Sequence, residues 1–395
     1  MSDRVTSNGA DDSIQPFVVN VPEADLADLR DRLARTRWPD ELPGVGWTYG
    51  ASLEYVKELA EYWRTSFDWR AQEAELNRYP QFTTTIDGQN IHFYHVRSNE
   101  PNAMPLLLIH GWPGSVIEFL NVIGPLTDPA AYGGDPADAF DVVIPSIPGF
   151  GFSGPTHETG WDVQRVTNAF ATLMNQLGYD RYATQGGDMG AFIAPHLGRV
   201  DSDRVIGVHV NAASVGFIPF GPVEPEVIEQ LTEIEKERLA KIERFTTDQW
   251  GYASIQSTRP QTLAFALHDS PVGQLAWIVE KFKEWTDPAK ELPHEAVDRD
   301  HLLTNVSLYW FTGTAGSSAR MYYENAHSSF WGALTRVEVP VGVAVFANDV
   351  AIRHFSEWGN NIQRWTDFDT GGHFAAMETP ELLTEDIRAF YRDLR

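Results

Sequence analysis

The sequence predicts an α/β protein with a mostly parallel central sheet flanked by helices, and three observations predict it. Short continuous apolar runs alternate with amphipathic helical patterns, which is typical of strands buried under helices on both faces. A glycine-rich motif at residues 186–190 joins one such run to the helical pattern that follows it. A long helical segment, residues 214–331, interrupts the alternation before strand-like sequence resumes at Val337.

The first 80 residues lie outside the predicted sheet. Residues 1–15 are polar and mixed in charge, and we expect them to form a disordered tail. Residues 16–80 are rich in Trp and repeat apolar residues at helical spacing, as in Leu26, Leu29 and Leu33. Such helices have one apolar face that must pack on another part of the protein. We therefore expect a helical extension that lies against the rest of the chain.

The core is expected to comprise residues 81–213 and residues 332–395. It begins with a β-hairpin whose strands, residues 82–86 and 91–96, are joined by an Asp87-Gly88 turn. Helical patterns then separate successive apolar runs, so the strands should pair in parallel. The predicted buried strands are residues 105–109, 141–144, 181–184, 205–210 and 341–346.

Asp188 is the candidate nucleophile, at the centre of Gly186-Gly187-Asp188-Met189-Gly190. This is the frame of the G-x-S-x-G nucleophile elbow, with Asp in place of Ser, between a predicted strand and a predicted helix. Glycines relieve the backbone crowding of such a turn, and the helix N-terminus favours a negative charge. The structural alternative is a plain turn in which Asp caps a helix.

A second glycine-rich loop, His110-Gly111-Trp112-Pro113-Gly114, follows the predicted strand at residues 105–109. In α/β-hydrolases one N–H of the oxyanion hole comes from this position, and the other comes from the residue after the nucleophile. We expect the backbone N–H groups of Trp112 and Met189 to face a developing oxyanion. His110 itself is expected to order the loop by hydrogen bonding and to transfer no proton.

The candidate acid and base follow later in the chain. Asp349 comes after the predicted strand at residues 341–346, and His373 lies in Gly371-Gly372-His373-Phe374. The resulting order, nucleophile then acid then base, is that of an α/β-hydrolase, and the order with its context carries the assignment. The competing acids are Glu357, Asp367 and Asp369, and the competing histidines are His92, His95, His196 and His354.

These motifs resemble those of the epoxide hydrolase family, specifically its microsomal-type branch with an N-terminal extension. The resemblance covers H-G-W-P, G-G-D-x-G and G-G-H, and it runs from about Phe17 to the end of the chain. It implies an α/β-hydrolase fold with an inserted helical lid at residues 214–331. It also implies two lid tyrosines that polarise the epoxide oxygen, which match Tyr252 and Tyr322, with Tyr323 as the alternative to the second.

The chemistry of an epoxide suits these residue types. A carboxylate, with an ordinary pKa of about 3.9, is ionised at neutral pH, while a phenol of pKa about 10 still carries its proton. Asp188 would open the ring to give an alkyl-enzyme ester, and His373, oriented by Asp349, would activate the water that hydrolyses it to a vicinal diol. No metal or organic cofactor is required. Trp112, Phe150 and Trp250 are expected pocket residues, with core packing as the alternative.

Three other functions compete with this interpretation. A haloalkane dehalogenase also uses Asp and an ester, but Met189 offers no side-chain N–H to a halide. A carboxylesterase is disfavoured because the elbow lacks Ser. A catalytically inactive α/β-hydrolase that acts as a binding protein is the alternative from another class, and the retention of Asp188, Asp349 and His373 argues against it.

Composition limits the partners. A net charge of −25 opposes binding to nucleic acid. The absence of Cys excludes disulfides and thiolate nucleophiles. The sequence shows neither a secretory signal nor an apolar run near the ~20 residues that span a bilayer. We expect a cytoplasmic protein that does not bind the membrane. The resemblance implies a homodimer, as in several soluble relatives of that family. It also implies that the protein uses water and a small apolar or aryl epoxide, in detoxification or natural-product biosynthesis.

Overall fold

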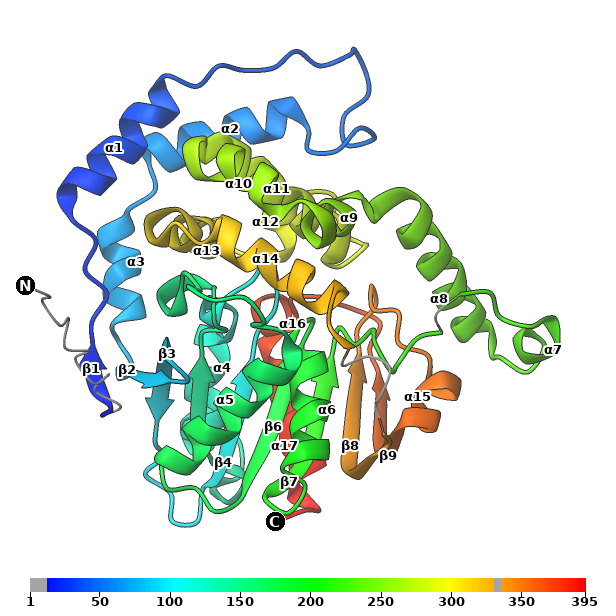
Figure 1. Ribbon diagram of the computed structural model, residues 1–395. Helices are drawn as coiled ribbons and strands as arrows, with labels where there is room; N and C mark the ends of the chain where they lie inside the picture. The colour runs from blue at the N-terminus through cyan, green and yellow to red at the C-terminus, as the bar shows by residue number, and fades with distance from the viewer. Residues whose placement is uncertain (1–12, 220, 330–334) are drawn as a thin grey trace, which may run out of the picture.

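The computed structural model describes residues 13–219, 221–329 and 335–395. In this part of the chain one sheet contains nine strands, in the order β1-β2-β3-β5-β4-β6-β7-β8-β9 (Figure 1). From β5 to β9 every neighbouring pair is parallel, whereas β1, β2 and β3 join the sheet antiparallel. The strands are β1 Gln15–Phe17, β2 Gln81–Ile86, β3 Gln89–Val96, β4 Met104–Ile109, β5 Phe140–Pro145, β6 Tyr182–Gly187, β7 Val205–Asn211, β8 Val337–Val345 and β9 Asn360–Asp367. The predicted mostly parallel sheet is confirmed.

Helices cover both faces of the sheet because successive residues of a strand point to opposite sides. On β4, Leu107 and Ile109 pack with helices α5 (Val163–Gln176) and α6 (Gly190–Val200). The alternate residues Leu106 and Leu108 pack with α4 (Leu120–Thr127) and α17 (Pro380–Arg392) on the other face. The apolar run that predicted this strand is therefore continuous because its alternate residues pack against helices on opposite faces of the sheet. The remaining core helices are α15 Arg353–Gly359 and α16 Ala375–Glu378, with short 3-10 helices at Val116–Phe119, Pro129–Tyr132, Pro136–Asp138 and Gly151–Ser153.

The N-terminal extension contains α1 (Glu23–Ala34), α2 (Leu53–Thr65) and α3 (Trp69–Leu76), which run beside the sheet and over the inserted helices (Figure 1). Before them, β1 begins at Gln15, inside the range expected to be disordered, because Gln15 pairs with Thr83 on the edge of the sheet. Residues 1–12 of that range lie outside the described residues. The tail prediction is therefore wrong at Gln15.

A set of helices, α7 to α14, is inserted between β7 and β8 and lies across one end of the sheet (Figure 1). The hydroxyl of Tyr309 on α13 donates to the carbonyl of Gly114 at 2.6 Å, so the insertion contacts the loop that follows β4. This places it over the carboxyl ends of the parallel strands, where open α/β sheets bind ligands. The inserted helices are α7 Pro225–Ile228, α8 Glu233–Arg244, α9 Gly251–Thr258, α10 Pro260–Asp269, α11 Pro271–Trp285, α12 Pro293–Ala296, α13 Arg299–Thr312 and α14 Ala315–Ala326, with a π-helical segment at Phe245–Gln249.

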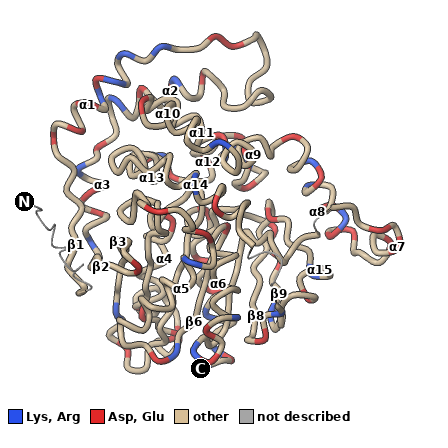
Figure 2. The backbone as a smooth tube through the Cα atoms, in the orientation of Figure 1, with Lys and Arg blue, Asp and Glu red and all other residues tan. Residues whose placement is uncertain are grey.

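Charges of both signs mix along the outer helices. Figure 2 shows Lys and Arg interspersed with Asp and Glu on α1 and α8. Such mixing is typical of solvated helix faces. Among the helices in the described residues, none is long and apolar enough to cross a membrane.

Candidate active site

Asp188 lies at the turn between β6 and α6, with a positive φ of 54°. The turn is so tight that a Cβ atom at Gly186 would collide with the carbonyl of Gly190, and a Cβ at Gly190 would collide with the carbonyl of Ile109. Only glycine fits at both positions. A non-glycine residue with positive φ costs about 1–3 kcal/mol and is typical of a strained functional turn. The backbone thus has the form of a nucleophile elbow.

The two N–H groups expected in the oxyanion hole point at the carboxyl group of Asp188. The Trp112 N–H donates to Oδ1 at 2.9 Å, and the Met189 N–H also forms a hydrogen bond with this carboxyl group. The loop can approach so closely because Gly111 has no side chain: a Cβ there would collide with the Asp188 side chain. Oδ1 therefore has a backbone donor, and the two N–H groups together orient the carboxyl group.

His373 lies on the loop between β9 and α16 and faces the second oxygen of Asp188. Its Nε2 atom is 3.6 Å from Oδ2, which is slightly longer than a hydrogen bond. The His373 N–H donates to the carbonyl of Trp285 at 2.8 Å, and the Trp285 ring lies 4.7 Å from the imidazole. The structure thus brings together the predicted nucleophile and the predicted base, although 185 positions separate them in the sequence.

Asp349 follows β8 and is almost completely buried, with 5% of its surface exposed. Its Oδ2 atom accepts hydrogen bonds from Phe346 N–H at 3.1 Å and Ala212 N–H at 3.2 Å. The loop that carries it lies beside the loop of the base, because the Asn348 N–H donates to the carbonyl of Gly371. The pairing of Asp349 with the Nδ1 atom of His373 stays a prediction.

Tyr252 on α9 and Tyr322 on α14 meet above the oxyanion loop. The Trp112 ring stacks on Tyr252 at 5.1 Å and meets the edge of Tyr322 at 5.8 Å. The two phenols share a side-chain hydrogen bond. Tyr323, by contrast, is 38% exposed and stacks on His327. Of these two neighbours, Tyr322 is the one that contacts Trp112 and Tyr252, and its role as the second lid tyrosine stays a prediction.

Comparisons with known proteins agree with this geometry. The family described as epoxide hydrolase N terminus matches residues 14–119, and the family described as alpha/beta hydrolase fold matches residues 104–338. The chain is 46% identical over 388 residues, 97% of its length and 86% of the relative, to a protein of Stigmatella aurantiaca whose name assigns it to the epoxide hydrolases. It is 37% identical to epoxide hydrolase 1 of Sus scrofa, over 96% of this chain and 89% of that relative. The chain belongs to the epoxide hydrolase family.

Solved structures of family members extend the likeness to the whole fold. The juvenile hormone epoxide hydrolase of Bombyx mori superimposes with a TM-score of 0.87 at 31% identity, covering 98% of this chain and 96% of that one. The epoxide hydrolase of Aspergillus niger gives a TM-score of 0.84 at 34% identity, with 98% of both chains covered. The α/β-hydrolase fold and the family resemblance seen in the motifs are confirmed.

In this member of the epoxide hydrolase family, burial sets the protonation states of Asp188, His373 and Asp349. It raises the pKa of Asp188 to about 6, although the N–H groups of Trp112 and Met189 oppose the shift. It lowers the pKa of His373 to about 3 and raises the pKa of Asp349 to about 6. At neutral pH the carboxyl group of Asp188 is therefore anionic and the imidazole is neutral, as a nucleophile and a general base require.

The buried charge of Asp188 should weaken the fold. Because its folded-state pKa, about 6, lies above the ordinary value of 3.8, the carboxylate destabilises the folded state above pH 6, and this cost disappears below pH 4. We expect Asp188→Asn to raise the free energy of unfolding at pH 8 by about 3 kcal/mol. Denaturant unfolding at pH 8 and at pH 4 measures the difference. A variant less stable than the wild type at pH 8, or a gain that is the same at both pH values, would contradict the expectation.

The three expected pocket residues lie in different surroundings. Trp112 is 2% exposed and packs on both tyrosines. Trp250 is 44% exposed, and its ring centroid lies 6.4 Å from that of Tyr252. Phe150 is fully buried against the ring of His110 and supports the oxyanion loop from behind. The structure therefore favours the core-packing alternative for Phe150.

His110 holds the oxyanion loop in place. Its Nε2 atom accepts the N–H of Ile147 at 3.1 Å, so the proton resides on Nδ1, which donates to the carbonyl of Gly111 at 3.0 Å. Burial lowers the pKa of His110 to about 4. Both ring nitrogens are thus bonded to backbone, which supports the expected ordering role.

Four of the seven competing acids and histidines form side-chain hydrogen bonds away from the site. They bond to side chains outside the site: His92 to Ser146 and Gln81, His95 to Tyr179, Asp367 to Arg238, and Glu357 to Arg353. His354 packs its ring on Phe355 and Trp358, His196 lies on α6, and Asp369 follows β9. The assignment of Asp349 and His373 as acid and base, made from their order in the chain and their context, stays a prediction.

Sequence reasoning missed two residues at the site. Trp285, at the end of α11, contacts the rings of Tyr252 and His373, but its sequence context is an ordinary helical pattern. Glu118 lies close behind the oxyanion loop, since a Cβ at Gly114 would collide with its carboxyl group. Burial and the charge of Asp188 raise the pKa of Glu118 well above its ordinary value. The position of Glu118 shortly after the H-G-W-P-G motif is the sequence signal by which it could have been identified.

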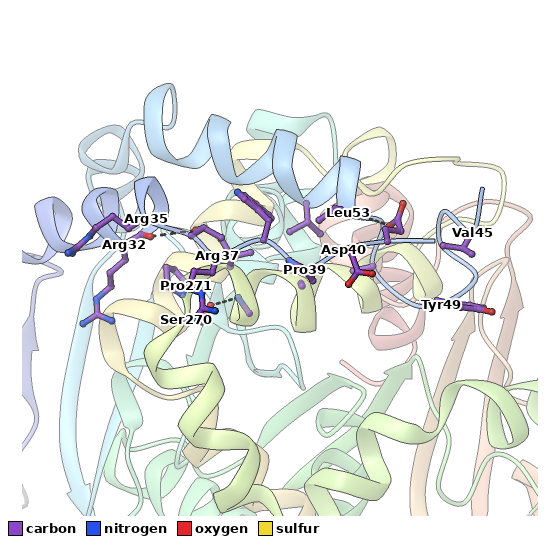
Figure 3. A pocket seen from close by; sticks show the side chains of 18 of the residues that line it. Arg32, Arg35, Arg37, Pro39, Asp40, Val45, Tyr49, Leu53, Ser270 and Pro271 are labelled. Atoms are coloured by element: carbon purple, nitrogen blue, oxygen red, sulfur yellow. Dashed lines mark hydrogen bonds between the residues drawn. The ribbon is translucent and has the colours of Figure 1, made fainter. Parts of the chain in front are cut away.

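A surface groove of about 840 Å³ lies away from this site. Figure 3 shows Arg37, Pro39 and Pro271 along it. Its lining comes from the end of α1, the loop after it, α2 and the junction of α10 with α11. The groove therefore separates the extension from the inserted helices and does not include Asp188. In the described residues no cluster of three or more His, Asp or Glu side chains could hold a metal ion.

Proposed function

We propose that the protein converts an epoxide to a vicinal diol through a covalent ester on Asp188. The observation that carries the proposal is the placement of the two oxygens of this carboxyl group. Oδ1 accepts the Trp112 N–H at 2.9 Å, while Oδ2 faces Nε2 of His373 at 3.6 Å, beneath the two phenols. This arrangement gives one oxygen for attack and one for the later oxyanion.

In the first step, Oδ2 attacks a ring carbon and the bond from that carbon to the epoxide oxygen breaks. The alkoxide that forms takes a proton from the hydrogen-bonded pair Tyr252 and Tyr322. The pKa of each phenol is raised by burial, and the charge of Asp188 contributes, so both hold their protons until the ring opens. Attack turns the Asp188 carboxylate into a neutral ester, which removes one cause of the raised phenol pKa, and the strongly basic alkoxide then takes the phenol proton.

In the second step, Nε2 of His373 takes a proton from water as the water oxygen adds to the ester carbonyl carbon. The oxyanion develops on Oδ1, which already accepts the Trp112 N–H, and the Met189 N–H, which bonds the same carboxyl group, supplies the second donor. Collapse breaks the bond from this carbon to Oδ2, the departing oxygen takes the proton of the added hydroxyl group, and the diol leaves with Oδ2, which restores the carboxylate of Asp188. The imidazolium, which Asp349 would stabilise, returns its proton to the tyrosinate.

Aromatic rings support an apolar or aryl epoxide as the substrate. Trp112, Tyr252 and Trp285 lie within 6.4 Å of one another by ring centroids. We also propose that residues 214–331 act as the lid, since α9 and α14 supply the two phenols; residues 220, 330 and 331 of this range lie outside the described residues. The homodimer and the cytoplasmic location stay predictions.

The proposal is tested by product analysis with styrene oxide and a panel of alkyl epoxides, beside a matched panel of haloalkanes. We expect diol from epoxides and no halide release. Halide release without diol formation would favour the dehalogenase, and a folded protein inactive on both panels would favour the binding protein.

Removing both phenols should slow ring opening more than removing one. We expect Tyr252→Phe and Tyr322→Phe each to slow ester formation about 10-fold to 100-fold, because the remaining phenol still donates, and the double variant to slow it about 10³-fold. Single-turnover kinetics with excess enzyme measure this step. Tyr323→Phe, next to Tyr322 but outside the site, is the control. A double variant that forms the ester at more than a third of the wild-type rate would contradict the assignment.

A further inference from the structure

We propose that Asp287 and Glu378 are positioning residues that hold His373 in place for hydrolysis of the ester and have little effect on its formation. The proposal rests on the function proposed above. Asp287 comes shortly after the end of α11 in the inserted helices, and Glu378 ends α16, just after the loop of His373. The two carboxyl groups form a clamp, named here the α11 clamp, between that loop and α11.

Both sides of His373 are held by the α11 clamp. Oδ2 of Asp287 accepts the Gly371 N–H at 2.9 Å and the Thr370 hydroxyl at 2.9 Å, which fixes the chain before the base. Oε1 of Glu378 accepts the Phe374 N–H at 3.0 Å, which fixes the chain after it. Oε2 of Glu378 accepts the Asp287 N–H at 2.8 Å and so links the two residues of the α11 clamp to each other.

Backbone contacts make the end of α11 a common support for the base and the acid. The His373 N–H donates to the carbonyl of Trp285, and a Cβ at Gly372 would collide with the same carbonyl. The side-chain amide of Asn348, next to Asp349, donates to the carbonyls of Glu284 at 2.9 Å and Thr286 at 2.8 Å. Loops from β8 and β9 are thus tied to one helix end that belongs to the insertion.

Charge and burial make the α11 clamp sensitive to substitution. Asp287 is 7% exposed; burial alone would raise its pKa, but the N–H groups of Gly371 and Ala289 lower it, so it is a carboxylate at neutral pH. Both of its oxygens accept hydrogen bonds, from Gly371, Thr370 and Ala289. An amide offers only one accepting atom, and therefore Asp287→Asn must leave donors facing an NH₂ group.

The α11 clamp acts on one step because the two steps use His373 differently. Attack by Asp188 needs no base, whereas hydrolysis needs Nε2 to lie within reach of a water molecule at the ester. A displacement of about 1 Å can slow such a step about 10²-fold. We expect Asp287→Asn and Glu378→Gln to slow ester hydrolysis about 10-fold to 100-fold and to change ester formation less than 3-fold.

The experiment measures both steps in the full-length protein with styrene oxide. Single-turnover kinetics give ester formation, and intact mass after acid quench gives the fraction of enzyme held as ester during turnover. When hydrolysis limits turnover, kcat and KM fall together and kcat/KM is unchanged. Glu381→Gln, the same replacement at an exposed acid on α17, is the matched control and should behave as wild type.

The outcomes separate the α11 clamp from a general structural role. Accumulated ester with an unchanged kcat/KM supports it. Equal slowing of both steps, or no change in either, overturns it. Thr370→Val, which removes only the hydroxyl bond to Asp287, repeats the test if the other variants do not fold, and is expected to slow hydrolysis about 3-fold to 10-fold. If neither the wild type nor His373→Gln ever forms an ester, the proposed function has failed instead.

Discussion

The Asp188→Asn variant is expected to form diol at least about 10⁴-fold more slowly than the wild type. The amide oxygen can still accept the Trp112 N–H, so the elbow should keep its geometry while the anion that attacks the ring is lost. Diol formation with a large amount of enzyme, followed by chromatography, measures the residual rate.

Two controls make the Asp188→Asn result interpretable. Mass spectrometry of the elbow peptide shows whether the Asn has deamidated back to Asp. Asp203→Asn, an exposed acid on the loop before β7, carries the same change of charge and should have full activity. Activity within 10-fold of the wild type, with the amide intact, would exclude Asp188 as the nucleophile.

The His373→Gln variant is expected to stop at the ester. Ester formation should proceed near its normal rate, because a carboxylate attacks without a base, while turnover should fall about 10³-fold or more. Mixed with styrene oxide, nearly all of the protein should gain the mass of one epoxide, and the modified peptide should contain Asp188. His354→Gln, on α15, is the matched control. Loss of turnover without an adduct, or an adduct on another residue, would contradict the assigned roles.

The pH dependence of the two steps should differ. The pKa of Asp188, raised by burial to about 6, predicts that ester formation slows as the pH falls through 6. The pKa of His373, lowered by burial to about 3, predicts that the base stays neutral over the same range. Stopped-flow measurements between pH 5 and pH 8 would show this. A limb near pH 6 that appears in ester hydrolysis and is absent from ester formation would contradict the titration of Asp188 and assign it to Asp349, whose pKa is also about 6, or to His373.

The sequence predicted the parts of the fold that depend on local patterns. The run around Leu106–Ile109 is apolar throughout because its alternate residues pack under different helices, and this signal identified β4. The elbow was visible because the close approach at Gly186 and Gly190 excludes every side chain, which leaves glycine at a fixed spacing around Asp188. Such constraints act within a few residues and therefore appear in the sequence.

Other features depend on contacts between distant residues. Gln15 joins the sheet only through its pairing with Thr83, and three residues carry too little pattern to predict a strand. Trp285 reaches the site because its carbonyl binds the His373 N–H, 88 positions later in the chain. Tyr322 and Tyr323 are neighbours in one motif, and only the orientation of α14 places one inside and the other outside.

The central claim is that the oxygen gained by the substrate comes from Asp188, and a single turnover in H₂¹⁸O tests it most directly. With enzyme in excess over styrene oxide, the first diol should contain no ¹⁸O, because it leaves with Oδ2, and the label should instead appear in the elbow peptide that contains Asp188. Diol from later turnovers should then carry the label. A first-turnover diol that already contains one ¹⁸O atom, with an unlabelled elbow peptide, would mean that water attacks the epoxide directly and would contradict the ester mechanism.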